Sequence, residues 1–174
     1  MFYRYILIVV VISYNIFGND LKNIKMFEAN FKQEIINDSN NTIVYTGKIY
    51  IKEPNFILWK YKKPIIKNVY FNKNRVFIDE PILEQVIITD INQDINIIKL
   101  LKKSKKISND MYKGSVEGIN FKIIMNKEKI NSINYKDKMY NNIFITFTNI
   151  VQNHRIDDEI FIFNIPLNYD IIRK

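Results

Sequence analysis

Cysteine is absent from this sequence of 174 residues. The protein can therefore form no disulfide bond, offers no thiol nucleophile and holds no metal ion through thiolate ligands. The chain is also not itself a bacterial lipoprotein, because the acyl groups of those proteins are attached to a cysteine at the mature N-terminus. Glycine and proline are scarce, with four residues of each, and no glycine-rich phosphate-binding loop is present.

Alanine is nearly absent too, since Ala29 is the sole example, whereas 12 Phe, 11 Tyr and one Trp are present. A chain with many β-branched and aromatic residues and few strong helix formers is expected to be mainly β. Its length suits a single domain with one core. The aromatic surplus has two explanations: a densely packed aromatic core, or an open half-barrel whose concave face is aromatic.

The first eighteen residues have the pattern of an export signal. Arg4 is followed by an apolar run from Tyr5 to Ile12, and a small residue, Gly18, ends the segment. Ser13 interrupts the run well short of the roughly 18 apolar residues that a membrane-spanning helix needs. We therefore expect a cleaved signal peptide at 1–18 and a single domain at 19–174, with an uncleaved anchor as the alternative.

The formal net charge is +8. Such an excess suits nucleic acid, anionic lipid headgroups or an acidic partner. The expected export argues against nucleic acid, and a simply solvated lysine-rich surface is the plain alternative.

Alternating apolar residues predict a series of strands. A short helix from Asp20 to Met26 is expected first, although apolar spacing also allows a continuous helix to Ile35. The strands expected in the first half are 27–35, 43–51, 57–61, 69–71, 76–78 and 82–88. Those expected in the second half are 112–116, 119–125, 129–135, 142–150 and 159–165. This regular spacing predicts an antiparallel sheet curled into a barrel or half-barrel.

One longer helix is expected between the two halves, from Thr89 to Lys103. Asp90 and Gln93 have the spacing of a capping box at its start. The apolar stripe of this helix consists of Ile91, Ile95, Ile98 and Leu101, and Ile97 and Leu100 widen it. Such a stripe packs on a core, and a lid over a cavity has the same pattern.

The residues that carry chemistry do not form a catalytic pattern. His154 is the only histidine and lies in a polar segment, and the chain has no Gly-x-Ser-x-Gly nucleophile elbow. The acids at 157–159 are expected to be solvated turn residues. We therefore expect no enzyme, no metal site and no cofactor.

Four strings of this sequence together resemble the LolA family of periplasmic lipoprotein carriers. They are F-E-A-N-F-K-Q at 27–33, G-K-I-Y-I-K-E-P-N-F-I-L-W at 47–59, D-E-P-I-L-E-Q at 79–85, and F-I-F-N-I-P-L-N-Y-D-I-I at 161–172. The resemblance implies an unclosed (half-open) antiparallel β-barrel with a short α-helical lid covering an apolar cavity. It implies that the cavity is lined by Ile49, Ile51, Ile57, Trp59 and Tyr61, and that the two helices form the lid.

The sequence departs from the family at two positions. The family typically has an arginine just before the corner proline, where this chain has Glu53, and another ahead of the tryptophan, where it has Leu58. A carboxylate cannot donate the hydrogen bonds of a guanidinium. We expect that Glu53 pairs with a lid lysine, either Lys99 or Lys102, or that the lid latch is missing.

The resemblance implies a soluble, monomeric periplasmic carrier that binds the acyl chains of lipoproteins. It would accept them from an inner-membrane ABC-type lipoprotein-releasing transporter and deliver them to the outer membrane, where a receptor is a further expected partner. The lack of cysteine separates a carrier from that receptor, which is a lipoprotein. The alternatives are a periplasmic lipid- or glycolipid-binding or lipid-sensing module of the same architecture and, from another class, an exported hydrolase.

Overall fold

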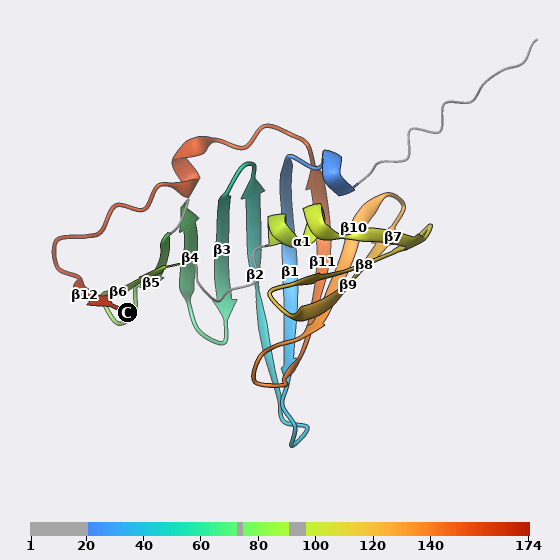
Figure 1. Cartoon of the computed structure of the whole chain (residues 1–174). Helices are drawn as coiled ribbons and strands as arrows, with labels where there is room; N and C mark the ends of the chain where they lie inside the picture. Colours follow the sequence, from blue (N-terminus) through green and yellow to red (C-terminus); the bar gives the residue numbers. More distant parts are fainter. Residues whose placement is uncertain (1–20, 73–74, 91–96) are drawn as a thin grey trace, which may run out of the picture.

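In the computed structural model of the protein, the described residues are 21–72, 75–90 and 97–174. They form one twelve-stranded sheet in the order β12-β6-β5-β4-β3-β2-β1-β11-β10-β9-β8-β7. The two edge strands, β12 and β7, do not pair with each other, so the sheet curls without closing (Figure 1). The expected mainly β, half-open architecture is confirmed.

The first half of the sheet contains β1 (Met26–Ile36), β2 (Thr42–Lys52), β3 (Phe56–Lys63), β4 (Lys67–Asn72), β5 (Arg75–Glu80) and β6 (Gln85–Asp90). The second half contains β7 (Lys105–Ser108), β8 (Met111–Val116), β9 (Ile119–Asn126), β10 (Lys129–Lys136) and β11 (Asn142–Gln152), and β12 (Asp170–Arg173) joins the first half. The helical elements are the 3-10 turn η1 (Leu21–Asn23), the α-helix α1 (Ile97–Lys103) and the 3-10 turn η2 (Asp158–Phe161). None of the described helices has the length and apolarity needed to cross a membrane.

Strand β1 joins the two halves of the sheet. It pairs along its length with β2, from Met26 opposite Lys52 to Ile36 opposite Thr42, and with β11 on its other side. All neighbouring strands are antiparallel except β12, which pairs with β6 in parallel. The parallel strand departs from the purely antiparallel sheet that we expected.

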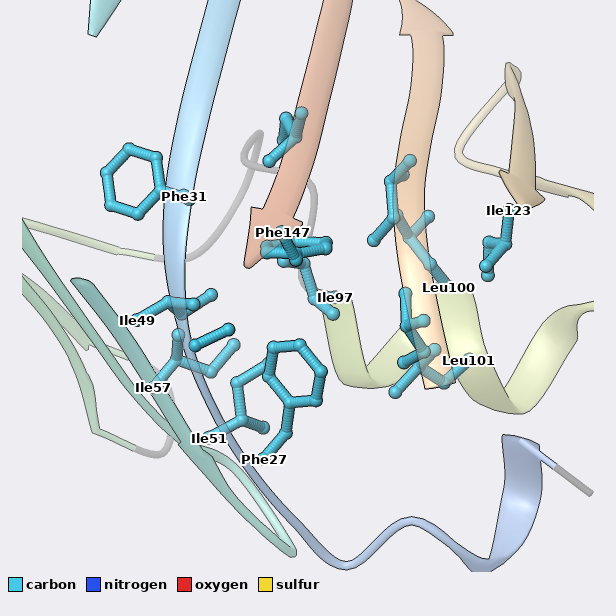
Figure 2. Packing of buried hydrophobic residues seen from close by; sticks show 14 of the residues in the cluster. Phe27, Phe31, Ile49, Ile51, Ile57, Ile97, Leu100, Leu101, Ile123 and Phe147 are labelled. Carbon is cyan, nitrogen blue, oxygen red and sulfur yellow. The ribbon is translucent and has the colours of Figure 1, made fainter. Parts of the chain in front are cut away.

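The concave face of the sheet carries the main core. Alternate residues of each strand point to this face, as the two-residue period of a strand requires. In β1 they are Phe27, Ala29 and Phe31, all less than 5% exposed. Helix α1 and the turn η1 lie over this face, and Figure 2 shows side chains of α1 among those of β1, β2 and β11.

The convex face is covered by the C-terminal segment. Leu58, at the position of the second family arginine, is fully buried there with Ile156 and Phe161. Further along, the ring of Phe163 stacks on that of Tyr70 at a centroid distance of 5.1 Å. This burial raises the pKa of the Tyr70 hydroxyl.

The region before β1 contains a 3-10 turn at Leu21–Asn23 in place of the expected short helix to Met26, which already belongs to β1, and the continuous helix to Ile35 does not form. The helix expected at 89–103 is shorter. Thr89 and Asp90 end β6, so Asp90 is not a helix cap, and the described helix begins at Ile97. Gln93, Ile91 and Ile95 lie in 91–96, outside the described residues.

Two predicted strands need correction. The strand expected at 82–88 begins only at Gln85, because Pro81 starts a turn in which the Leu83 N–H donates to the Glu80 carbonyl at 3.0 Å. The strand expected at 159–165 does not form. Its beginning belongs to η2, and the following residues extend over the convex face without a strand partner. The predicted alternation was correct, since Phe161 is buried and Phe163 half-buried while Ile162 between them is exposed. An extended segment that is covered on one side alternates as a strand does, even when it forms no hydrogen bonds to a neighbouring strand.

Gly47 permits close packing between β1, β2 and β3. A Cβ atom at this position would lie 2.0 Å from the carbonyl oxygen of Lys60 and 2.8 Å from the Phe31 ring. We expect Gly47→Ala to lower the free energy of unfolding by about 1–3 kcal/mol or more, because backbone cannot easily move aside. Urea denaturation measures this loss. Ser115→Ala, at an exposed strand position, is the control, and equal stability of the two variants would show that β3 moves freely.

Candidate functional site

The five residues predicted to line a cavity all lie on the concave face. Their strands hold them in register, with Ile49 opposite Trp59, Ile51 opposite Ile57, and Gly47 opposite Tyr61. Ile49, Ile51 and Ile57 are at most 3% exposed and are packed within the core cluster. Trp59 and Tyr61 instead border an open space beside that cluster.

This space is a cavity of about 250 Å³ between the concave face and α1. Besides Trp59 and Tyr61, its lining consists of Gln33, Lys67, Val69, Phe71, Ile78, Ile97, Leu100, Ile133, Tyr135 and Ile145. The sequence prediction placed Ile97 and Leu100 on the apolar side of the lid helix and missed the other eight residues. Strand register gives a signal for two of them, since Val69 lies opposite Trp59 and Phe71 opposite Ile57. The residues of β10 and β11 carry no such local signal, because Ile145 meets Gln33 and Ile133 only through the pairing of β11 with β1, which is distant in sequence, and with β10.

The rings of Trp59 and Tyr61 form one wall of the cavity, and the Phe31 ring packs against both of them. The Phe31 ring meets Trp59 edge to face at a centroid distance of 4.8 Å and Tyr61 at 5.1 Å, and Trp59 stacks on Tyr61 at 6.1 Å. These geometries are the ones that aromatic pairs prefer. Gly47 lets the Phe31 ring lie directly over β2, which brings it to Trp59. The wall is therefore a rigid apolar surface held by three neighbouring strands.

The rim of the cavity is polar. The Tyr61 hydroxyl donates to Gln33 Oε1 at 3.2 Å. Lys67 Nζ lies 4.8 Å from the centre of the Tyr61 ring and 5.6 Å from that of Tyr45, within the range of cation–π attraction. Lys67 is the charged member of the lining and is half-buried. The site thus combines apolar walls with a polar, cationic border.

Helix α1 closes the cavity from above. Ile97, Leu100 and Leu101 are each at most 3% exposed, and Ile97 and Leu100 border the open space (Figure 2). Of the predicted lid stripe, Leu101 packs as expected, whereas the side chain of Ile98 lies outside what the structure describes. A helix of seven residues is far too short to be stable alone. Its position therefore depends on these apolar contacts and on a few polar ones.

One such polar contact joins the lid to the corner between β2 and β3. Lys102 Nζ lies 3.2 Å from Glu53 Oε1, and the two side chains are 52% and 27% exposed. The neighbouring residue of the corner, Lys52, pairs with Asp158 of the segment on the convex face. An ion pair this exposed contributes about 0.2–1 kcal/mol. Such a contact can hold a lid closed and still release it.

The candidate chemical groups do not gather in the cavity. His154 Nε2 lies 3.0 Å from Glu28 Oε2, and Lys48 Nζ lies 2.5 Å from Glu28 Oε1. Glu28 is on the convex side of β1, since its neighbours Phe27 and Ala29 fill the concave core. The hydrogen bond from Lys48 lowers the pKa of this carboxyl. Among the described residues, no group of three or more His, Asp or Glu side chains has a metal-binding arrangement.

Comparison with known proteins points in one direction. The sequence profile of the family described as "Outer membrane lipoprotein carrier protein LolA" matches residues 22–164. The chain is 37% identical over 158 residues to an outer-membrane lipoprotein carrier protein of Campylobacter jejuni, covering 91% of this chain and 92% of that protein. It is 35% identical over 156 residues to one of Helicobacter pylori, with 88% and 83% covered.

Among solved structures, a LolA superfamily protein from Nitrosomonas europaea is similar, with a TM-score of 0.50 over 83% of this chain and 94% of that one. The two sequences are 9% identical. At such low identity, the likeness concerns the fold alone.

Trp59 reports on the lid, because it is the only tryptophan and is 8% exposed beneath α1. Glu53→Arg places a second cation against Lys102, so we expect the open population to rise about twofold to fivefold, which is the effect of about 0.5–1 kcal/mol. Quenching of Trp59 fluorescence by acrylamide should increase accordingly.

The reversed pair Glu53→Arg/Lys102→Glu is the matched control and should restore the original quenching. If acrylamide quenches Trp59 equally in the single and the double variant, then this ion pair does not hold the lid.

Proposed function

The chain belongs to the LolA family of outer-membrane lipoprotein carrier proteins, and from this membership we propose that it carries lipoproteins by enclosing their acyl chains on its concave face. The aromatic-walled cavity beneath α1 is the observation that carries this proposal. Its residues supply apolar surface and a covering element, and the function requires no chemical reaction.

Acyl chains need such a cover in water. Exposure of each CH₂ group costs about 0.8 kcal/mol, so a long chain left in water costs on the order of 10 kcal/mol. A carrier must shield most of that surface and still yield it to the next acceptor. Weak closure of the lid fits both demands, since opening lowers the affinity for the chain.

The cavity must enlarge when cargo binds. Its volume of about 250 Å³ lies below the roughly 300–1,000 Å³ of typical small-molecule pockets. We infer that α1 moves outward and that the packed residues Ile49, Ile51 and Ile57 then become additional lining. The described structure accordingly corresponds to a closed lid.

The route of the cargo follows from this function. A periplasmic, monomeric carrier would receive acylated lipoproteins from an inner-membrane ABC-type transporter and pass them to the outer membrane, directly or through a receptor. The lid latch in this chain is the Glu53–Lys102 pair. A cation on the helix and an anion at the corner here take the place of the arginine that the family typically has at the corner.

Trp59→Ala should weaken binding of a fluorescent acyl-chain probe about fivefold to thirtyfold, since about 1–2 kcal/mol of apolar contact is lost. Probe titration measures this affinity. Tyr50→Ala, on the convex face of the same hairpin, is the matched control and should leave it unchanged. Equal affinities of the two variants would place the acyl site away from the aromatic wall.

A release assay tests the carrier role itself. We expect purified protein, added to inner-membrane vesicles with ATP, to appear in the supernatant as a complex with lipoproteins. Omission of ATP should abolish release, and Trp59→Ala should reduce it. Probe binding without any release would argue for a lipid-binding or lipid-sensing module instead. Turnover of a lipid ester by the protein would indicate a hydrolase.

A further inference from the structure

Three lysines form a row across the convex face at the far edge of the sheet. Lys105 of β7 lies opposite Lys113 of β8, and Lys113 lies opposite Lys122 of β9. Opposed residues of neighbouring strands share a face, and the buried neighbours of Lys122, Phe121 and Ile123, point to the concave side. All three lysines are exposed, and within the described chain none forms an ion pair with an acid. Directly opposed like charges destabilise a sheet.

Two open hollows make this row part of one continuous surface. The first, of about 370 Å³, is bordered by Lys113, Lys122, Asn134 and Phe144 among others. The second, of about 460 Å³, is bordered by Lys136, Lys138 and Tyr140. The hollows share Asn120, so the row continues into the turn between β10 and β11. We call this surface the basic face, consisting of Lys105, Lys113, Lys122, Lys136, Lys138, Met139 and Tyr140.

The turn between β10 and β11 exposes apolar side chains. Met139 is 75% exposed and Tyr140 is 67% exposed, and Lys136 Nζ lies 5.7 Å from the centre of the Tyr140 ring. Exposed apolar residues flanked by lysines are typical of surfaces that meet the water–lipid interface.

The neighbouring turn between β1 and β2 serves as an internal comparison. Asn37 Oδ1 accepts from the N–H groups of Ser39 at 3.0 Å and Asn41 at 2.9 Å. In the same pattern, Asp137 Oδ1 accepts from the N–H groups of Met139 and Asn141, each at 2.9 Å. The first turn carries Asp38, Ser39 and Asn40 where the second carries Lys138, Met139 and Tyr140. The turn geometry therefore does not require the exposed apolar pair.

Few acids oppose the five lysines of the basic face. Glu117 and Asp137 border the second hollow. The Asp137 carboxylate is occupied by the turn, because its Oδ2 also accepts from Asn141 Nδ2 at 2.9 Å. Even when both acids are counted, the surface keeps an excess of three positive charges.

We propose that the basic face binds peripherally to bilayers that contain anionic phospholipids. The lysines contact headgroup phosphates, and Met139 and Tyr140 enter the interfacial layer. A plane of anionic headgroups can satisfy lysines that are spread over three strands, and the apolar tip favours a bilayer over an acidic protein surface. Because the cavity is on the opposite face, this binding leaves the lid accessible and is independent of the proposed acyl site.

The test is cosedimentation of the chain expected after removal of residues 1–18 with vesicles made of equal parts phosphatidylcholine and phosphatidylglycerol. We expect binding to these vesicles, little binding to pure phosphatidylcholine, and weakening at high salt. The triple variant Lys105→Gln/Lys113→Gln/Lys122→Gln should bind about a hundredfold less, at about fivefold per lysine.

Two further variants show whether binding depends on where the lysines lie rather than on the net charge, and whether the exposed turn contributes to binding. Lys60→Gln/Lys62→Gln/Lys63→Gln removes the same charge from exposed sites of β3 and should lose far less binding. Met139→Ser/Tyr140→Asn copies the polar β1–β2 turn and should also weaken binding. Thermal denaturation should show the basic-face triple variant to be at least as stable as the parent, since a repulsion is removed.

Absence of binding to the anionic vesicles would overturn the proposal, as would equal losses in the two triple variants. Binding to poly-glutamate as tight as to vesicles, with no effect of Met139→Ser/Tyr140→Asn, would also overturn it, in favour of an acidic protein partner. Affinity for the acyl-chain probe should be unchanged in every basic-face variant, so failure here is distinguishable from failure of the carrier function.

Discussion

The constraint on which this structure depends is an apolar concave face that no second sheet covers within the described part of the chain. Because β7 and β12 do not meet, the core side of the sheet faces an open space rather than the interior of a closed barrel. The cover is α1, a helix of seven residues whose own stability is negligible. The position of α1 is therefore set by its packing on the residues beneath it, and this is why we propose that cargo in the cavity displaces the helix.

The corner between β2 and β3 connects both coverings of the sheet. Its adjacent residues Lys52 and Glu53 pair in opposite directions, one with Asp158 on the convex side and the other with Lys102 of the lid. Both pairs are partly exposed, so each is weak and reversible. The corner thus connects α1 on the concave face and the C-terminal segment on the convex face to the same β2–β3 hairpin through weak ion pairs.

Much of the fold could be predicted from the sequence because strand periodicity is local. The alternation of Ile49 with Ile51 and of Ile57 with Trp59 gave the concave face correctly, and the motifs around them indicated the family. The site itself was only partly predictable. Ile133 and Ile145 reach the cavity through the pairing of β11 with β1, which joins segments more than a hundred residues apart and which no local pattern encodes. The segment at 159–165 was assigned to a strand because a covered, unpaired chain alternates as a strand does. The helix was predicted to begin too early, since Thr89 and Asp90 belong to β6.

The pairing of β12 with β6 has a consequence for the order in which the molecule assembles. The strands β4, β5 and β6 follow one another in sequence, yet the outer strand, β6, receives its second partner only from residues 170–173. Similarly, the second side of β1 is paired only by β11, which begins more than a hundred residues later in the sequence. Until these distant segments dock, one side of β6 and one side of β1 carry unpaired backbone, and loop closure over such separations is slow. We therefore expect the pairings of β1 with β11 and of β6 with β12 to be among the last contacts that form as the chain folds.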